Sequence, residues 1–367
     1  MAVKLFNILF LTIREDEYDF LRYRHTIDST VYADFAPEVE VTHIKLCERS
    51  FHPEEKDDNE VFFKSGHGFF NVPWNMLRFV RNNKPDVVMV HGFVFPFQLL
   101  FLRLFISRRC KIIIQHHAER PFKNVIKRWL QILAYTNADA YLFSSKWLAR
   151  QYRNAGVIRD KHQVHEVMEG SSLFKKKYRE VARSLLNMND GPVFLWVGRL
   201  DANKDPLTVL KAFKQYQENG GQFQLYMIYG TNELEAEARK FTESCALSVQ
   251  VHFVGAVPHQ ELENWFSAAD YFVAASYYEG SGIALCEAMA CGCIPVVSNI
   301  ASFEKMTNHG SCGVLFEPGN ADDLYEKLLI LSESDTDTMS HAVLEQFHNE
   351  LSFDAIGHKI KQIVLGL

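Results

Sequence analysis

The chain has 367 residues, of which 47% are hydrophobic and 23% are charged, and its formal net charge is −6. This length exceeds what one ordinary hydrophobic core accommodates and favours two domains. The acidic balance and the lack of a nucleic-acid-binding motif argue against DNA or RNA as a partner.

The cysteines and the apolar segments indicate a cytoplasmic protein. The seven cysteines include no CxxC pair, which favours free thiols in a reducing compartment over a metal site. The start MAVKLFNILFLT predicts a first β-strand rather than a signal peptide. The most apolar run, residues 93–106, is interrupted by Pro96, Gln98 and Arg103 and is too short to span a bilayer. Peripheral contact at the inner face of a membrane remains open.

The first half of the chain alternates strand-like and helix-like runs. Strands are predicted at residues 5–11, 87–91, 111–115 and 140–143, and helices at residues 74–81, 97–106, 122–135 and 145–154. Such alternation predicts a parallel sheet with helices on both faces.

The helix predicted at residues 122–135 combines apolar residues with nearby cations. Its apolar residues are Val125, Ile126, Trp129, Ile132 and Leu133, and its cations are Lys123, Lys127 and Arg128. Packing against the sheet is the favoured interpretation. The alternative is a surface helix that touches anionic lipid and brings a lipid-linked acceptor within reach.

The second half repeats the alternation. Strands are predicted at residues 193–197, 224–228, 249–254, 271–275 and 295–297, and helices at residues 206–217, 233–244, 259–267, 282–291, 322–331 and 353–364. The polar stretch between the halves carries the basic run 175–177, which we interpret as a solvated face, and a short helix at residues 180–186. We therefore expect an N-terminal domain at residues 1–170, a linker at 171–190 and a C-terminal domain at 191–351.

The most informative segment is YEGSGIALCEAMACGCIPVVSN, residues 278–299. Glu279, Gly280 and Gly282 fall in the predicted loop between a buried strand and a helix, and Glu287 lies inside that helix. A loop of this kind presents backbone N–H groups and a helix N-terminus, which together stabilise an anion such as a diphosphate. A carboxylate on each side of the anion can accept hydrogen bonds from sugar hydroxyls.

Glu-x7-Glu within EG-x-G-x-x-x-x-EAMA-x-G-x-PVV resembles the signature of the retaining, nucleotide-sugar-dependent glycosyltransferases of family 4 (glycosyl transferases group 1). Three further blocks resemble that family in the same order: VGRL at 197–200 with Lys204, FVG at 253–255 with Leu262 and Ala269-Asp270, and GVLF at 313–316 with Pro318-Gly319-Asn320. The resemblance implies a GT-B fold, with two Rossmann-like doubly wound α/β domains facing a cleft and the final helix, about residues 352–367, crossing back to the N-terminal domain.

The resemblance also implies roles for individual residues. Glu287 would bind the ribose hydroxyls of the nucleotide, and Glu279 would bind the donor sugar. The other implied donor contacts are Gly230, Val254, Gly280, Ser281, Gly282, Ile283 and Ala284. The plainer alternatives are that Glu287 is a helix-surface residue, that Gly282 only caps the helix, and that Gly230 forms an ordinary turn.

Arg199 and Lys204 follow a predicted strand and precede a helix, which places both on one rim of the sheet. Negative charge grows on the departing diphosphate during sugar transfer, so preorganised cations stabilise the transition state. Arg offers a planar fork and Lys a compact charge, and such a pair can replace a divalent metal. Taken alone, the two residues are surface charges in a β–α loop; within VGRLDANKDP, upstream of the two glutamates, a catalytic role is favoured.

His117 stands in the run QHHA that closes the strand at 111–115. The family places a histidine at such a strand end, near the donor sugar. The resemblance implies that His117 bonds to the sugar and holds the reacting centre, with proton transfer as a further role. A structural histidine at the end of a strand is the alternative.

The chain departs from the family at two places, both on the acceptor side. The turn Leu11-Thr12-Ile13-Arg14-Glu15-Asp16 lacks the two glycines of many members, and Glu169-Gly170-Ser171-Ser172 replaces an Asn-Gly-Val-Asp-like run. Asp335-Thr336-Asp337 has the aspartate spacing of a metal-binding motif but follows no strand, so we expect a loop there. We expect no metal and no cofactor.

These observations predict a glycosyltransferase that moves a sugar from a nucleotide-diphosphate sugar to a glycan, lipid-linked or small-molecule acceptor. Retention of configuration and independence of metal are expected by resemblance. One alternative is an epimerase or hydrolase of nucleotide sugars on the same fold. Another is an inactive binding protein in polysaccharide assembly.

Overall fold

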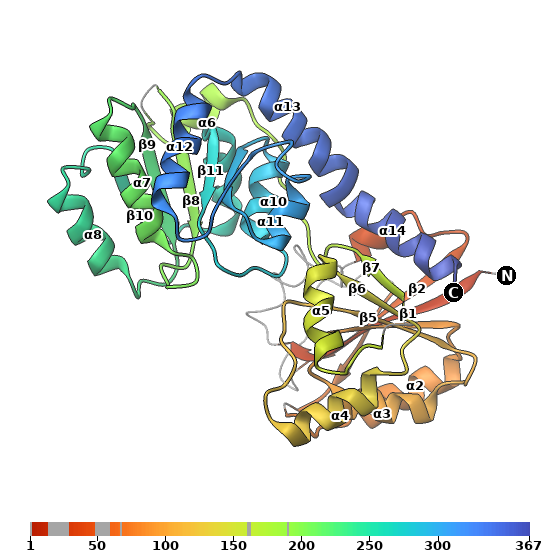
Figure 1. Cartoon of the computed structure of the whole chain (residues 1–367). Coiled ribbons are helices and arrows are strands. Elements are labelled where there is room, and N and C mark those ends of the chain that lie inside the picture. The colour runs from red at the N-terminus through yellow and green to blue at the C-terminus, as the bar shows by residue number, and fades with distance from the viewer. Residues whose placement is uncertain (1, 14–28, 48–58, 67, 160–162, 189–190) are drawn as a thin grey trace. The chain divides into compact units, whose positions relative to one another are not determined.

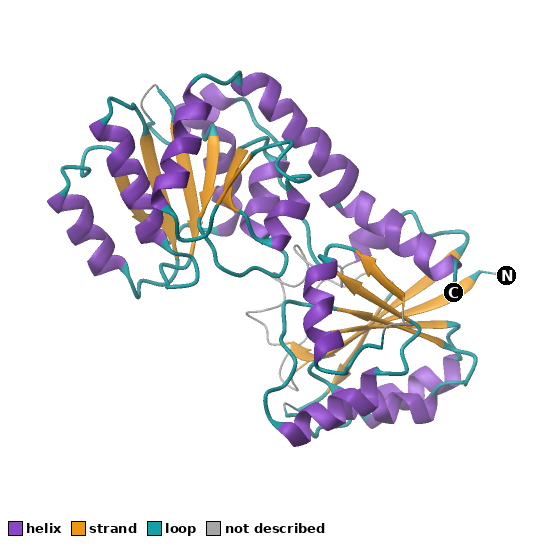
Figure 2. Ribbon diagram, viewed as in Figure 1, coloured by secondary structure: helices purple, strands orange, loops and turns teal. Residues whose placement is uncertain are grey.

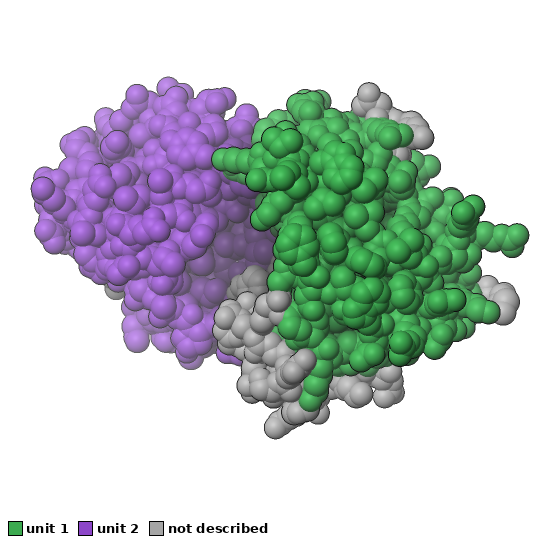
Figure 3. All heavy atoms as spheres, turned by 90° about the horizontal axis from the view of Figure 1, so that it is seen from below, with its two compact units in different colours: residues 1–171, 353–367 green, residues 172–352 purple. Residues whose placement is uncertain are grey.

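The computed structural model describes residues 2–13, 29–47, 59–66, 68–159, 163–188 and 191–367. The chain divides into two compact units, which Figure 3 distinguishes by colour. Unit 1 consists of residues 1–171 and 353–367, and unit 2 consists of residues 172–352. The segment predicted as a linker belongs to unit 2 from Ser172 onward. Within the described ranges, no helix is long and apolar enough to cross a membrane.

Unit 1 is built on a seven-stranded parallel sheet with the order β3-β2-β1-β4-β5-β6-β7. Its strands are β1 (Val3–Ile13), β2 (Val39–Cys47), β3 (Glu60–Lys64), β4 (Val87–His91), β5 (Lys111–Gln115), β6 (Ala140–Phe143) and β7 (Gln163–Glu166). Its helices are η1 (Ser29–Tyr32), α2 (Trp74–Asn83), α3 (Pro96–Phe105), α4 (Val125–Tyr135), α5 (Lys146–Asn154) and α14 (Phe353–Leu365). Helices α2, α3 and α4 lie together on one side of the sheet, and α14 lies on the other (Figure 1).

The strands β2 and β3 were not predicted because they carry polar side chains into the interior. Lys45 of β2 and Glu60 of β3 are both buried and form an ion pair. His43 is buried next to them. A buried charge is tolerated when it is paired, so an interior strand here lacks the apolar pattern by which strands are recognised.

Unit 2 is built on a six-stranded parallel sheet with the order β10-β9-β8-β11-β12-β13 (Figure 2). Its strands are β8 (Val193–Gly198), β9 (Gln224–Tyr229), β10 (Val251–Gly255), β11 (Tyr271–Ala274), β12 (Ile294–Ser298) and β13 (Val314–Phe316). Its helices are α6 (Arg179–Leu185), α7 (Pro206–Glu218), α8 (Glu235–Ser244), η2 (His259–Glu261), α9 (Leu262–Ala268), α10 (Ile283–Ala290), α11 (Ala301–Met306), α12 (Ala321–Ser332), α13 (Thr336–Gln346) and the π-helical turn η3 (Phe347–Leu351). The two parallel sheets confirm the predicted α/β fold class.

The segment Asp335-Thr336-Asp337, which was predicted as a loop, begins helix α13. Asp335 is the N-cap, and its Oδ1 accepts from the backbone N–H groups of Asp337 at 3.1 Å and Thr338 at 3.4 Å. A side-chain oxygen at this position satisfies amides that have no partner within the helix. The aspartate spacing is therefore explained by helix capping.

In each sheet the strand order reverses once, between β1 and β4 in unit 1 and between β8 and β11 in unit 2. The loops that follow the two strands at such a point diverge, and ligands of doubly wound folds bind there, at the carboxyl ends of the strands. In unit 2 these loops are residues 199–205 after β8 and residues 275–282 after β11. The fold thus brings the VGRL block and the glutamate block to one edge.

Helix α14 packs against η1 at a position where only glycine fits. A Cβ atom at Gly357 would lie 2.2 Å from the backbone oxygen of Val31. Further along the helix, the Nζ of Lys361 donates to the backbone oxygen of Asp34 at 2.6 Å and forms an ion pair with Glu38 at 2.9 Å. The final helix is therefore part of unit 1.

We predict that Gly357→Ala destabilises unit 1 by about 1–3 kcal/mol, because an added methyl group forces α14 away from η1. Urea unfolding measures the change in midpoint. Gly66→Ala is the matched control, since a Cβ there meets nothing within 4 Å. Equal midpoints for the two variants would contradict the close approach.

Candidate functional site

Gly282 forms the entrance to helix α10 and adopts a left-handed backbone, with a φ angle of 58°. A Cβ atom there would lie 2.8 Å from the ring of Phe303. Ser281 beside it is buried, whereas Ile283 and Ala284 at the start of the helix are partly exposed. Because the first backbone N–H groups of a helix have no partner within the helix, this loop offers donors for an anion.

Lys204 and Glu279 connect the loops on either side of the strand reversal. The Nζ of Lys204 lies 2.5 Å from Oε1 of Glu279, and both side chains are largely buried. The backbone N–H of Lys204 donates to the side chain of Asp201 at 3.0 Å, which fixes the loop. A small cavity beside the pair is lined by Trp196, Val197, Lys204, Glu279, Gly282 and Phe303, among others. The pair thus stands next to the N-terminus of α10.

Arg199 differs from Lys204 in its surroundings. Its side chain is 63% exposed, and its Nε forms an ion pair with Asp201 at 3.2 Å. Both cations contact Asp201, but only Lys204 is paired with one of the two glutamates. The structure therefore brings Lys204 and Glu279 together and leaves Arg199 at the outer rim of the same loop.

Glu287 is buried within α10 and bonds to a histidine that was not predicted. Its Oε1 lies 2.7 Å from Nε2 of His259, the first residue of η2. The His259 ring also stacks on Phe174, with 4.9 Å between ring centroids. The carboxylate of Glu287 is therefore not a helix-surface group. His259 follows the carboxyl end of β10, and this position was the only signal in the sequence.

Gly230 and Val254 lie at the same edge of the sheet. Gly230 directly follows β9 and is exposed, and a Cβ there would meet nothing within 4 Å. Val254 is the penultimate residue of β10 and is partly exposed; Gly255 after it has a φ angle of 82°. Because the strands are parallel, residues that end β8, β9, β10 and β11 gather at one edge.

His117 belongs to unit 1, where it follows β5 and contacts two side chains. Its Nε2 lies 2.8 Å from Nδ1 of His91, and its Nδ1 lies 3.3 Å from Oε2 of Glu169. Neither His91 nor Glu169 was predicted as a site residue. The glycine-poor turn at residues 11–16 is described only to Ile13; residues 14–16 lie outside the described part of the chain.

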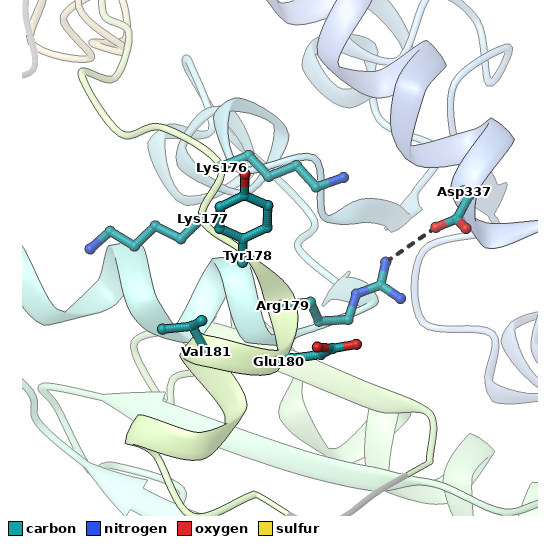
Figure 4. Close-up of a pocket in the computed structure, with 7 residues that line it drawn as sticks. All are labelled: Lys176, Lys177, Tyr178, Arg179, Glu180, Val181 and Asp337. Atoms are coloured by element: carbon teal, nitrogen blue, oxygen red, sulfur yellow. Dashed lines mark ion pairs between the residues drawn. The ribbon is translucent and has the colours of Figure 1, made fainter.

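A second hollow on unit 2 contains none of the predicted site residues. Its lining is Lys176, Lys177, Tyr178, Arg179, Glu180, Val181 and Asp337 (Figure 4). Its cations serve structural contacts: Lys176 donates to Ser340 at 2.8 Å and Lys177 pairs with Glu263 at 2.6 Å. The basic run at residues 175–177 therefore contacts α9 and α13, and is not only the solvated face that the sequence analysis expected.

Within the described residues, no three His, Cys, Asp or Glu side chains are grouped as a metal ion would require. Independence of metal stays a prediction.

Two family models match this chain, and one of them covers the site at the edge of the unit 2 sheet. The model "Glycosyl transferases group 1" matches residues 178–345, and the model "Glycosyltransferase Family 4" matches residues 27–165. The chain belongs to the group 1 glycosyltransferases, family 4 type. The first match covers the Lys204, Glu279 and Glu287 blocks, so the family signature and the edge of the unit 2 sheet coincide.

Relatives and solved structures agree in family and fold. The GDP-mannose:cellobiosyl-diphosphopolyprenol alpha-mannosyltransferase of Xanthomonas campestris is 26% identical over 71% of this chain and 68% of its own. The enzyme of that name from Komagataeibacter xylinus is 22% identical over 64% of this chain, which spans only 59% of the relative's length. Anabaena Alr3699/HepE in complex with UDP has a TM-score of 0.72 at 14% identity, with all of both chains covered. Sucrose-phosphate synthase from Thermosynechococcus elongatus has a TM-score of 0.70 at 19% identity, covering 100% of this chain and 99% of that one. These likenesses show a GT-B fold.

We predict that Gly282→Ala destabilises unit 2 for two separable reasons. A left-handed backbone costs an L-residue about 1–2 kcal/mol, and the new methyl group collides with Phe303. In urea unfolding, Gly282→Ala/Phe303→Leu should be less destabilised than the two single variants predict by addition, because the collision is relieved. Strict additivity would contradict the collision, and wild-type stability of Gly282→Ala would contradict both costs.

Proposed function

We propose that this glycosyltransferase moves a hexose from a nucleoside diphosphate sugar to an acceptor hydroxyl, with retention of configuration and without a metal ion. The observation that carries the proposal is the Lys204–Glu279 ion pair at the N-terminus of α10. A cation, a carboxylate and backbone donors are thereby present where a diphosphate and its sugar would bind.

In this proposal, residues at the edge of the unit 2 sheet make two kinds of contact with the donor: one with its diphosphate and one with its hydroxyl groups. The N-terminus of α10 and the Lys204 ammonium stabilise the negative charge that grows on the diphosphate as the anomeric C–O bond breaks. Arg199, which is exposed on the same loop, adds a second positive charge for the phosphates. Glu279 and Glu287 accept hydrogen bonds from sugar and ribose hydroxyls. The acceptor oxygen bonds to the anomeric carbon on the face that the diphosphate leaves, and its proton passes to the departing oxygen.

The names of the relatives support a more specific proposal for the classes of donor and acceptor. Two of them are GDP-mannose-dependent transferases that act on a diphosphopolyprenol-linked saccharide, and a structural neighbour was solved with UDP-glucose. We therefore propose a GDP- or UDP-hexose as donor and a lipid-linked saccharide as acceptor. Thermal stabilisation by a panel of nucleotides separates the two bases, because a ligand that binds the folded state raises the melting temperature.

We predict that Lys204→Ala lowers kcat by about 10²–10³, the loss typical of one transition-state donor, and that Glu287→Ala mainly raises KM for the donor. Turnover is measured with excess EDTA, which should leave the wild type unaffected. Lys214→Ala is the matched control, because Lys214 also pairs with a glutamate but on the solvent side of α7. Undiminished turnover in both site variants would refute the mechanism, and loss with EDTA would refute metal independence.

An exposed apolar surface on unit 1 supports the proposed lipid-linked acceptor. On α4, Val125, Ile126 and Trp129 are 80%, 72% and 61% exposed, whereas the helix buries Gln131, Ala134 and Tyr135. Helix α4 therefore packs on unit 1 as the favoured interpretation expected, but through these three residues and not through Val125, Ile126 and Trp129. Gln131 is accommodated in the interior because it donates to the backbone oxygen of Phe93 at 2.8 Å.

Aromatic contacts join residues 69–74, at the start of α2, to α3, and Lys127 of α4 lies beside them. The contacts include Phe70–Phe97 at 5.1 Å and Trp74–Phe101 at 5.2 Å between centroids, and Lys127 lies over the Phe69 ring. Phe70, Trp74 and Leu104 are largely exposed. Lys123 and Lys127, at the start of α4, are exposed cations in the same part of the chain. Exposed aromatic and aliphatic groups bordered by Lys and Arg are typical of proteins that bind anionic bilayers peripherally.

We predict that Ile126→Glu weakens binding to phosphatidylglycerol vesicles by about tenfold or more, because one buried aliphatic side chain contributes about 1.5–3 kcal/mol. Vesicle co-sedimentation measures it. Val249→Glu on unit 2 is the control, since Val249 is 74% exposed and Ile126 is 72% exposed. Equal binding of the two variants, or of neutral and anionic vesicles, would contradict this surface.

A further inference from the structure

A chain of hydrogen-bonded side chains crosses the strands of unit 1 and ends at His117. Its members are His43 of β2, Asn7 of β1, His91 of β4 and His117, with Glu169 beyond. Asn7 Nδ2 lies 3.1 Å from His43 Nδ1, and Asn7 Oδ1 lies 2.5 Å from His91 Nε2. His91 Nδ1 lies 2.8 Å from His117 Nε2. The first three members are fully buried, so these contacts are not exchanged with bulk water.

Asn7 determines the direction of these hydrogen bonds. An amide oxygen only accepts and an amide nitrogen only donates. Asn7 Oδ1 therefore accepts from the Nε2–H of His91, while its Nδ2 donates to His43. Burial disfavours a charged ring at His91, and a neutral His91 with its proton on Nε2 has a lone pair on Nδ1 that accepts from His117. The Nε2 atom of His117 consequently carries a proton.

Glu169 favours a second proton on the same ring. Its Oε2 lies 3.3 Å from Nδ1 of His117, and its side chain is 4% exposed. A buried carboxylate is stabilised by an adjacent positive charge, and a carboxylate favours the charged form of a histidine beside it. A second carboxylate nearby is that of Glu119, whose Oε2 accepts from the backbone N–H of His117 at 2.8 Å. It contacts the backbone, whereas Glu169 faces the ring nitrogen, so Glu169 is the principal counterion among the described residues.

The neighbouring histidine has the opposite environment. His116 Nε2 donates to the backbone oxygen of Glu119 at 2.9 Å, and its Nδ1 accepts from the N–H of Ala118 at 3.3 Å. These partners require one protonated and one unprotonated nitrogen, which is the neutral ring. Burial lowers the pKa of His116 to about 4. The two adjacent histidines thus have partners that favour different charges.

We propose that Asn7 and His91 are positioning residues that hold His117 as an imidazolium paired with Glu169, so that His117 supplies a fixed positive charge and an N–H donor and is not a general base. Because Nε2 faces His91, the Nδ1 side is the one that can turn to a ligand. A sugar hydroxyl there can accept from Nδ1–H and donate to Glu169. The charge assignment is independent of the proposed function; its use in sugar transfer rests on it.

The charge is tested on the full chain with ¹⁵N-labelled histidine, by the ring nitrogen shifts across a pH titration. The chain has 15 histidines, and the two signals are assigned with His117→Gln and His116→Gln. We expect both nitrogens of His117 to be protonated at neutral pH and His116 to be neutral. A neutral His117 at neutral pH overturns the proposal, whatever the variants do.

Variants test what holds the charge. In Glu169→Gln, His117 should become neutral at about one to three pH units lower than in the wild type, the usual effect of one opposite charge. His91→Phe should change the shift of His117 Nε2, because its acceptor is lost. Glu304→Gln is the matched control: it removes a carboxylate 3.0 Å from the exposed His309 and should leave His117 unchanged. An unaltered His117 titration in Glu169→Gln overturns the role of Glu169.

Kinetics then separates this proposal from the proposed function. Sugar transfer should decline at alkaline pH as His117 loses its proton, and Glu169→Gln should move this decline to lower pH. A rate that instead rises as His117 deprotonates would show a general base and overturn the assignment. If no sugar is transferred by the wild type, the proposed function fails while the spectra still decide the charge of His117.

Discussion

The ion pair between Lys204 and Glu279 is the contact on which the unit 2 site depends. It joins the loop after β8 to the loop after β11, the two loops that the strand reversal separates. Without this pair, the entrance to α10 would have backbone donors but no fixed cation. Its partial burial also matters, because electrostatic interactions are stronger away from water. In the proposed mechanism, the diphosphate replaces Glu279 as the partner of the Lys204 ammonium, and the Glu279 carboxylate then accepts from a sugar hydroxyl.

Much of the fold could be predicted from the sequence, because most strands are apolar and short. The predicted strands at 87–91, 111–115 and 140–143 coincide with β4, β5 and β6. Strands β2 and β3 were not predicted because they bury Lys45 and Glu60 as an ion pair. An ion pair between two strands leaves no apolar pattern in the sequence of either strand. The start of α13 was not predicted because Asp335-Thr336-Asp337 was interpreted as a loop, whereas Asp335 is the N-cap of the helix. The local sequence pattern therefore predicts helices and strands well where only apolar side chains are buried.

The candidate site likewise contains residues that the sequence predicts and residues that it does not. Lys204, Glu279 and Gly282 were predictable because they lie within continuous motifs that determine a loop and a helix start. His259, Glu169 and His91 were not, because each acts on a predicted residue from a different strand or loop. Their contribution is to fix the orientation and charge of a neighbour, which depends on hydrogen-bond partners and not on residue type. The difference in charge inferred for His116 and His117, adjacent in the chain, illustrates the point.

The place of α14 has a consequence for how the chain matures during translation. Unit 2 is one continuous stretch, whereas unit 1 needs residues 353–367 to cover η1. Domains of nascent chains generally fold from the N-terminus onward, but here the first unit to begin folding is the last to be completed. The N-terminal sheet lacks the helix that covers η1 until residues 353–367 have been synthesised. Removal of residues 353–367 would therefore destabilise unit 1, most of which is synthesised first.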